Sequence, residues 1–261
     1  MLLLKIVILV IGAWPFALSA GAERPPSQPT GIQGDDDREI VEGTAFPWRA
    51  IGRVNNAGRG FCTGVLIGER RVLTAAHCLR SRGGHVLSPP SEIHFLAGYS
   101  RGSYLAHSLA LSVWRDPARA AQEEPTDDWA VITLARPLGK TIGFLELEAF
   151  RPDLWQADRR LARHYVQAGY SQDRQHILTR HRNCEIAGFL PGLQTFAHRC
   201  DAMQGDSGSP ILARRGERYT VIGLHVATAR KQSLGVAITG ARILDRMSAH
   251  PEPIQPSRIT P

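Results

Sequence analysis

Short runs of β-prone residues, separated by glycine, proline and asparagine, make up most of the chain from residue 50 to residue 240. Such runs at this spacing are typical of antiparallel barrels rather than of alternating strands and helices. They fall into two series, so we predict an all-β fold of two packed antiparallel six-stranded barrels, over about residues 40–147 and 163–240. The runs are residues 50–54, 61–67, 71–73, 92–96, 109–113 and 129–134, then 163–168, 176–182, 196–200, 210–213, 219–226 and 234–238.

Helical patterns appear at two places outside these runs. Residues 150–162 are predicted to form a connector with helical character. Residues 241–250 carry apolar residues at helical spacing, which predicts a terminal helix packed on a barrel. Residues 251–261 are rich in proline, and we expect them to form a disordered tail.

Residues 1–22 have the features of a secretory signal peptide. An apolar run with a single lysine, Lys5, ends in Ala20-Gly21-Ala22, which matches the Ala-x-Ala pattern of a cleavage site. An uncleaved membrane anchor is the alternative, although Pro15 interrupts a run that is already short. No later segment is apolar enough to span a bilayer, so we expect a secreted or periplasmic protein without stable membrane insertion.

The net charge of +7 raises the question of whether the protein binds nucleic acid. The arginines are dispersed, and the doublets Arg159-Arg160 and Arg214-Arg215 have no interleaved aromatic residues. This distribution is typical of a solvated surface, with weak attraction to anionic envelope polymers, rather than of a nucleic-acid site. We expect no nucleic-acid partner, and we expect the protein to be a monomer.

One turn of the second series has the composition of a catalytic turn. Gly205-Asp206-Ser207-Gly208 places a serine between two glycines, so the backbone can turn sharply and present the hydroxyl and neighbouring N–H groups to a ligand. Because an alcohol is a poor nucleophile at neutral pH, the turn can be catalytic only if a base and a partner for that base lie elsewhere.

Both partners are present upstream of the turn. A short apolar strand leads into His77, and Asp128 directly precedes another apolar strand. The order His, Asp, Ser is that of chymotrypsin and differs from that of α/β-hydrolases. On Leu73 to Cys78, Asp128 to Leu134 and Gly205 to Pro210, the chain resembles the chymotrypsin-like (trypsin-like) serine proteases.

Further segments make the chain more similar to bacterial, glutamyl-endopeptidase-like (V8-like) members of that family than to vertebrate digestive enzymes. They are Cys62 to Ile67, Cys200 to Ala202, Ser209-Pro210 and Ile222 to His225. The resemblance implies a serine endopeptidase, over residues 40–250, that hydrolyses proteins or peptides through an acyl-enzyme intermediate. It implies no cofactor and no metal.

The resemblance also implies a role for each catalytic residue. Ser207 would be the nucleophile, His77 the general base, and Asp128 the acid that orients the imidazole. The backbone N–H groups of Gly205 and Ser207 would form the oxyanion hole. Asp127 is the alternative acid, but the family places this residue directly before the apolar strand.

Other arrangements fit the sequence less well. Ser207, Asp245 and His250 follow the hydrolase order, but the serine turn lacks the final glycine of a nucleophile elbow. A metal-dependent hydrolase would need a His-Glu-x-x-His or paired-cysteine motif, which the sequence lacks, so the remaining histidines are interpreted as surface or core residues. A catalytically silent homologue that acts as a binding module is the last alternative, although no member of the triad is lost.

Four cysteines in an exported chain indicate two disulfides, and the count alone permits three connectivities. The family resemblance implies that Cys62 pairs with Cys78 and Cys184 with Cys200. Each bridge would close a loop of about 16 residues and stabilise the fold by about 3 kcal/mol in the chain-entropy model. Free thiols are the alternative, but export disfavours them.

The segment before the first barrel resembles a zymogen leader. Residues 23–39 are predicted to be a leader or propeptide, flexible over their proline-rich first part, and they end in an acidic run followed by Arg38 and Glu39. In the trypsin-like family a freed N-terminal ammonium inserts beside the aspartate before the nucleophile, which implies Ile40 and Asp206 as an activation switch. Cleavage after Arg38 would leave Glu39 at the new terminus, and a charged surface turn is the alternative.

The resemblance gives two conflicting indications about the substrate pocket. In acid-specific members a histidine at the position of His225 helps to bind substrate glutamate, but Ala202 stands where a hydroxyl usually assists. Asp201 lies where trypsin carries the carboxylate that pairs with lysine or arginine, yet V8-like members without that preference also have an aspartate there. Gly235 resembles the glycine that keeps the pocket wall open. We predict a preference for charged or mid-sized polar side chains.

Overall fold

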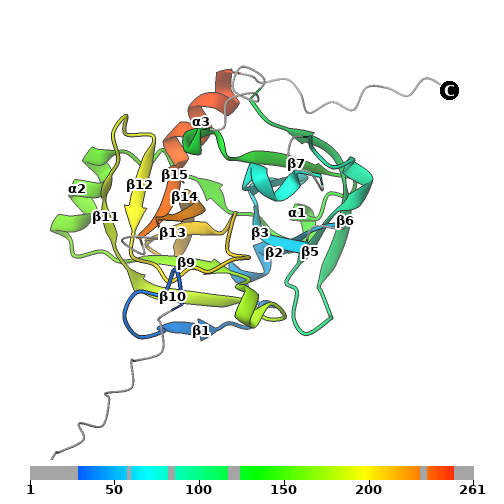
Figure 1. Cartoon of the computed structure of the whole chain (residues 1–261), viewed down its shortest axis with the longest axis horizontal. Helices are drawn as coiled ribbons and strands as arrows, with labels where there is room; N and C mark the ends of the chain where they lie inside the picture. The colour runs from blue at the N-terminus through cyan, green and yellow to red at the C-terminus, as the bar shows by residue number, and fades with distance from the viewer. Residues whose placement is uncertain (1–28, 58–59, 82–85, 117–123, 230–233, 250–261) are drawn as a thin grey trace, which may run out of the picture.

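The computed structural model of the chain consists of two β-sheet halves that lie side by side, with a terminal helix beside them (Figure 1). In this view the strands of the first half lie on the right and those of the second half on the left. The predicted signal peptide and C-terminal tail lie outside the described residues. The structure describes residues 29–57, 60–81, 86–116, 124–229 and 234–249.

The first half is a closed barrel in which strands neighbour one another in the order β2-β3-β4-β7-β6-β5. Apolar side chains such as Val54, Leu73 and Phe95 fill its interior. Gly52 lies against the Phe95 ring, where an added Cβ would be 2.5 Å from the ring carbons, so only glycine leaves room for the ring. The strands are β2 (Ile51–Asn56), β3 (Gly60–Leu66), β4 (Arg71–Thr74), β5 (Ile93–Ala97), β6 (Ala106–Trp114) and β7 (Ala130–Leu134).

The second half is a nine-stranded sheet whose main path runs β1-β10-β9-β13-β14-β15-β12-β11, with β8 parallel to β14. The prediction of an all-β fold with two packed halves is confirmed, but the second half, as the structure describes it, is an open nine-stranded sheet and not a six-stranded barrel. The sequence patterns did not indicate β1, β8 and β11. These strands have two to four residues, too few to show an alternating pattern. Among the described residues the path has ends at β1 and β11, whereas the first barrel is closed. The strands are β1 (Arg38–Ile40), β8 (Glu146–Leu147), β9 (Tyr165–Gly169), β10 (Thr179–Cys184), β11 (Ile186–Phe189), β12 (Thr195–His198), β13 (Pro210–Arg215), β14 (Arg218–Ala229) and β15 (Leu234–Thr239).

Short helices connect the strands. Helix α2 (Pro152–Arg160), within the predicted connector, has proline and an aspartate in its first turn and arginines in its last, as the helix dipole favours. Helix α3 (Gly240–Ala249) is the predicted terminal helix. Within the described part of the chain, no helix has the length and apolarity needed to cross a membrane. The other helical segments are α1 (Gly139–Ile142) and the 3-10 turns η1 (Trp48–Ala50), η2 (Ala76–Leu79), η3 (Pro90–Glu92), η4 (Pro125–Asp127) and η5 (Gln172–Arg174).

One hydrophobic core extends across both halves and fixes how they dock. Tyr170 and Leu212 of the second half belong to the same buried cluster as Val65 and Leu73 of the first barrel. The hydroxyl of Tyr170 also donates a hydrogen bond to the carbonyl of Tyr99 at 2.9 Å. A buried polar group that is bonded across an interface favours one register of the two halves, because any shift would leave it without a partner.

Helix α3 is also joined to the first half, by two ion pairs with the segment that precedes β7. Arg242 Nη2 lies 2.6 Å from Asp127 Oδ1, with both side chains largely buried. One turn further along the helix, Arg246 pairs with Asp116. Because α3 follows the second sheet in the chain, these ion pairs attach the end of the second half to the segment that carries the candidate catalytic acid.

Candidate active site

The His77 side chain lies at the start of turn η2, directly after β4, where Asp128 contacts it twice. His77 Nδ1 lies 2.6 Å from Asp128 Oδ2, and the backbone N–H of His77 donates to Asp128 Oδ1 at 2.8 Å. The carboxylate therefore fixes both the ring and its backbone, which leaves Nε2 as the ring nitrogen that can accept a proton. Asp127, the alternative acid, is bonded to Arg242 instead.

The turn that carries Ser207 is attached to the same part of the first barrel. The N–H of Thr63 in β3 donates to the carbonyl of Ser207 at 2.9 Å. Cys78, the neighbour of His77, has its sulfur 3.9 Å from that carbonyl oxygen. These contacts place Ser207 next to the histidine segment, although the two residues lie in different halves of the fold.

The side chains of Ser207 and His77 make no hydrogen bond with each other among the described residues. Such bonds are often long before a substrate is bound. Of the hydrolase-order alternative, Asp245 pairs with Arg151 on the surface, and His250 lies outside the described residues. The structure thus brings His77 and Asp128 into contact with each other and places Ser207 beside them.

The backbone of the serine turn leaves two N–H donors available. Gly205 has a φ of +95°, and an added Cβ would lie 2.4 Å from the carbonyl oxygen of Tyr170, so the position requires glycine. The N–H groups of Asp206, Gly208 and Ser209 donate to backbone carbonyls. Within the described part of the chain, those of Gly205 and Ser207 have no acceptor, as an oxyanion hole requires.

A chain of hydrogen bonds fixes the protons of two buried histidines. The N–H of Cys200 donates to His198 Nδ1, so the proton of the neutral His198 ring lies on Nε2. His198 Nε2 lies 3.0 Å from His225 Nδ1, so His198 is the donor and the proton of neutral His225 lies on Nε2. Burial, with His77 nearby, lowers the pKa of His225 to about 4. His225 is therefore a neutral N–H donor at physiological pH.

Asp201 is fully buried, and its carboxylate is occupied by the leader. Its Oδ1 accepts the N–H of Gln33 at 2.7 Å, and its Oδ2 accepts the N–H of Asp37 at 3.1 Å. The next residue, Ala202, is also buried and donates its N–H to the carbonyl of Gly31 at 3.0 Å. The part of the predicted flexible leader that the structure describes is thus packed against residues 201 and 202.

Gly235 leaves room for His198. An added Cβ at Gly235 would lie 2.1 Å from the His198 ring, so any side chain would displace the imidazole. The sequence patterns did not indicate His198 or His181 as part of the site, yet His198 bonds His225, and His181 accepts the N–H of Asp201. The positions of His181 and His198 in the sequence do not reveal these contacts, because the contacts arise only when the strands pair.

The two residues of the predicted activation switch are not in contact. Ile40 lies in β1, paired with Thr179 of β10, and its side chain is 61% exposed. Asp206 is buried at 1% exposure. The predicted boundary between leader and protease domain, between residues 39 and 40, falls inside β1, so this strand belongs to the folded domain.

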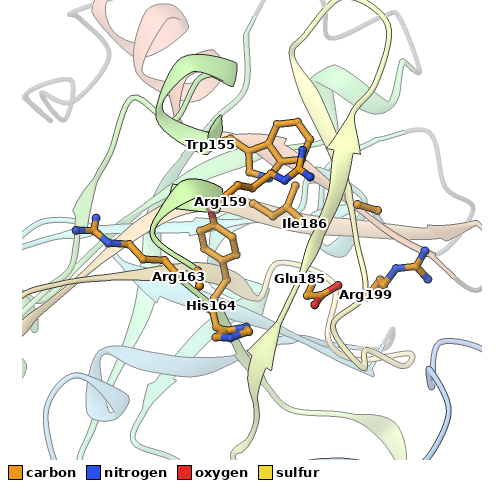
Figure 2. Close-up of a pocket in the computed structure, with 10 residues that line it drawn as sticks. Trp155, Arg159, Arg163, His164, Glu185, Ile186 and Arg199 are labelled. Atoms are coloured by element: carbon orange, nitrogen blue, oxygen red, sulfur yellow. The ribbon is translucent and has the colours of Figure 1, made fainter. Parts of the chain in front are cut away.

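Two surface hollows differ in whether candidate catalytic residues line them. One of about 320 Å³ borders His77 and Asp128 and is also lined by Val226, but its described lining includes neither Ser207 nor the predicted pocket residues. Figure 2 shows another, of about 470 Å³, between α2 and β11, where the Arg159 guanidinium lies 5.2 Å from the Trp155 ring. The described residues that line the second hollow include no member of the triad.

Both disulfides implied by the family resemblance are present, Cys62–Cys78 and Cys184–Cys200. The first lies beside His77, where three potential metal-ligand atoms come together. Two of these are sulfurs that share the disulfide, and a metal needs a thiolate. This group of atoms therefore forms a structural disulfide beside His77 and does not have the thiolates that would bind a metal.

Acid is expected to destabilise the fold through His225. Its pKa is about 4 in the folded chain and 6.5 in an exposed histidine, so the unfolded chain binds more protons between these values. The stability contributed by the neutral ring is therefore complete above pH 6.5 and is lost as the pH falls towards 4, by about 2 kcal/mol between pH 7 and pH 5. Urea unfolding at several pH values measures this loss, which His225→Gln should reduce. If the free energy of unfolding changed equally with pH in parent and variant, a buried neutral His225 would be contradicted.

The chain matches a known family and known proteins in sequence. The family model described as Trypsin matches residues 37–246. Glutamyl endopeptidase of Bacillus licheniformis is 24% identical over 204 residues, which cover 77% of this chain and 60% of that protein. Trypsin beta of Drosophila erecta is 30% identical over 131 residues, which cover 48% of this chain and 49% of that protein. The chain thus spans less than two thirds of the length of these relatives.

Solved structures share the fold. The structure of Glu endopeptidase in complex with MPD has a TM-score of 0.71 at 18% identity, and the match covers 84% of this chain and 98% of that one. The VesB protease of Vibrio cholerae has a TM-score of 0.62 at 18% identity, over 83% of this chain and 67% of that one. The family model extends from the leader to α3, and the chain therefore belongs to the trypsin family, as the sequence resemblance predicted.

Proposed function

We propose that this protein is an exported serine endopeptidase, with Ser207 as nucleophile, His77 as general base and Asp128 as the residue that orients the base. Ser207 attacks the peptide carbonyl while His77 Nε2 takes its proton, and His77 then returns that proton to the leaving amine. The resulting acyl-enzyme is hydrolysed by water through the same steps. The negative oxygen of each tetrahedral intermediate is held by the N–H groups of Gly205 and Ser207.

The observation that carries this proposal is the double contact between Asp128 and His77, next to the turn of Ser207. A carboxylate that binds both the ring and the backbone of a histidine sets one tautomer and one ring orientation, as a general base requires. Export is supported by the signal-like N-terminus and by two disulfides, which persist in oxidising compartments.

A fluorophosphonate probe tests the proposal, because it reacts with an activated serine without needing a particular peptide. We expect the full chain to be labelled on Ser207, and Ser207→Ala to remain unlabelled. His77→Ala should label and hydrolyse peptides at least about 10³-fold more slowly, because the base is lost. Ser103→Ala, which changes an exposed serine of the first half, is the matched control and should react like the parent.

The same experiment separates the enzyme from a catalytically silent binding module. A folded parent chain that stays unlabelled, with the native disulfides formed, would favour the binding module. Labelling of a serine other than Ser207 would contradict the proposed nucleophile.

We further propose that the enzyme cleaves after acidic residues. The neutral His225 ring offers an Nε2 proton, which suits a carboxylate oxygen of a substrate glutamate. Asp201 supports no preference for lysine or arginine, because its carboxylate already accepts two leader N–H groups. The relative named glutamyl endopeptidase supports the same substrate class.

Peptides that differ only in the residue before the cleaved bond test this preference. We expect kcat/KM to be highest for glutamate, and His225→Leu to lower it by about 10- to 100-fold for glutamate, the worth of one hydrogen bond to a charged group. Fluorophosphonate labelling of His225→Leu serves as the control and should be retained, because the probe places no glutamate in the pocket. A parent enzyme that prefers lysine, arginine or large aromatic residues would overturn the pocket assignment.

A further inference from the structure

The carboxylate of Asp206 is buried, and no cation among the described residues is bonded to it. Its Oδ2 accepts the Ser171 hydroxyl at 2.5 Å and the N–H of Met203 at 2.8 Å, and its Oδ1 accepts Gln167 Nε2 at 3.2 Å. All three donors are neutral. Burial raises the pKa of Asp206, and these hydrogen bonds, together with the more distant charge of Arg38, act in the opposite direction. The group therefore has the partners that a buried carboxyl needs, in a chain whose residues 29–40 are still attached.

The peptide group between Gln204 and Gly205 is also fixed in this uncut chain. The carbonyl of Gln204 accepts the N–H of Gln172 at 2.7 Å. In a trans peptide the C=O and the following N–H point in opposite directions, so the N–H of Gly205 is turned away from Gln172. One of the two donors of the candidate oxyanion hole is thus oriented by a backbone bond, and Gln172 directly follows Ser171.

The bond after Arg38 is poorly placed for an activating protease. The Arg38 side chain is only 1% exposed and bonds the carboxylates of Asp36 and Asp173. Arg174 bonds the Arg38 carbonyl at 2.9 Å, and β1 is paired with β10. A trypsin-like protease must draw the arginine side chain into its own pocket, which would require this strand and these ion pairs to open.

Removal of the leader would also take two N–H donors away from the buried carboxylate of Asp201. Two of its hydrogen bonds come from the backbone of Gln33 and Asp37, and β1 continues the same segment. Leaving a buried carboxylate without donors is unfavourable. These bonds make the described part of the leader an integral part of the folded domain beside the pocket residues.

We infer that the chain is catalytically competent with residues 29–40 in place, and that Ser171 and Gln167 are positioning residues that hold the serine turn through Asp206. They occupy the place that the family's activation mechanism gives to a new N-terminal ammonium. This inference rests on the proposed function. It differs from the predicted switch in one measurable respect, because no peptide bond between residues 29 and 40 has to be cut.

The state of the N-terminus of the active enzyme tests the inference. The secreted full chain is treated with the fluorophosphonate, and mass spectrometry of the labelled molecules determines whether residues 29–40 are still attached. We expect labelled molecules to retain this segment, and treatment with trypsin to produce no gain in labelling rate. A labelling rate that rises together with a new N-terminus at Glu39 or Ile40 would overturn the inference and leave the proposed function standing. Absence of label in every form would overturn both.

Variants of the carboxyl and its donors give a second, independent test. Asp206→Asn keeps an oxygen for Ser171 and Met203, so we expect a loss in kcat/KM of no more than about tenfold. If an ammonium were required, this variant would lose its ion-pair partner, and the loss would be on the order of 10²- to 10³-fold, as when an oxyanion donor is removed.

Substitution of Ser171 separates a positioning role from a merely structural one. Ser171→Ala should lower kcat about tenfold with little change in KM, because the bond acts on the turn and not on substrate binding. Ser171→Thr keeps the hydroxyl and should restore most of kcat. Thermal unfolding of both variants is measured alongside. A Ser171→Ala enzyme that loses stability but keeps its kcat would overturn the positioning role.

Discussion

The geometry of the site depends on the hydrogen bonds that the buried residue Thr63 makes through its backbone and its hydroxyl. Its N–H donates to the Ser207 carbonyl, its hydroxyl donates to the Gly205 carbonyl at 3.0 Å, and the N–H of Tyr170 donates to that hydroxyl at 2.9 Å. One residue of the first barrel thus holds both ends of the catalytic turn and the strand end beside it. Because Thr63 follows Cys62, the disulfide to Cys78 connects this junction to the histidine segment.

Buried carboxylates explain why the leader and the second sheet form one unit. A carboxylate removed from water needs donors on both oxygens, and donors from distant segments fix those segments to one another. Asp201 takes its donors from the leader, and Asp206 takes two of its donors from β9 and the residues that follow it. The N-terminal segment, the pocket and the serine turn are therefore mutually dependent, although they are far apart in the sequence.

The triad candidates could be predicted from sequence because each lies in a local pattern. His77 and Asp128 adjoin apolar strands, and Ser207 lies between glycines that the turn requires. The bonds to Asp201 could not be predicted, because their donors are backbone N–H groups 168 and 164 residues away, which carry no side-chain signal. The strand β1 was missed for a related reason, since three residues show no periodicity and the strand forms only by pairing with β10.

The arrangement of the serine turn can be tested by a crystal structure of the full chain after reaction with a peptidyl phosphonate ending in glutamate. We expect a phosphorus atom bonded to Ser207 Oγ, with its oxygen about 3 Å from the N–H groups of Gly205 and Ser207. We also expect Thr63 still to bond the turn and Asp206 still to bond Ser171. An adduct in which Asp206 has turned to a newly formed N-terminus, or a Ser207 that does not react, would contradict this arrangement.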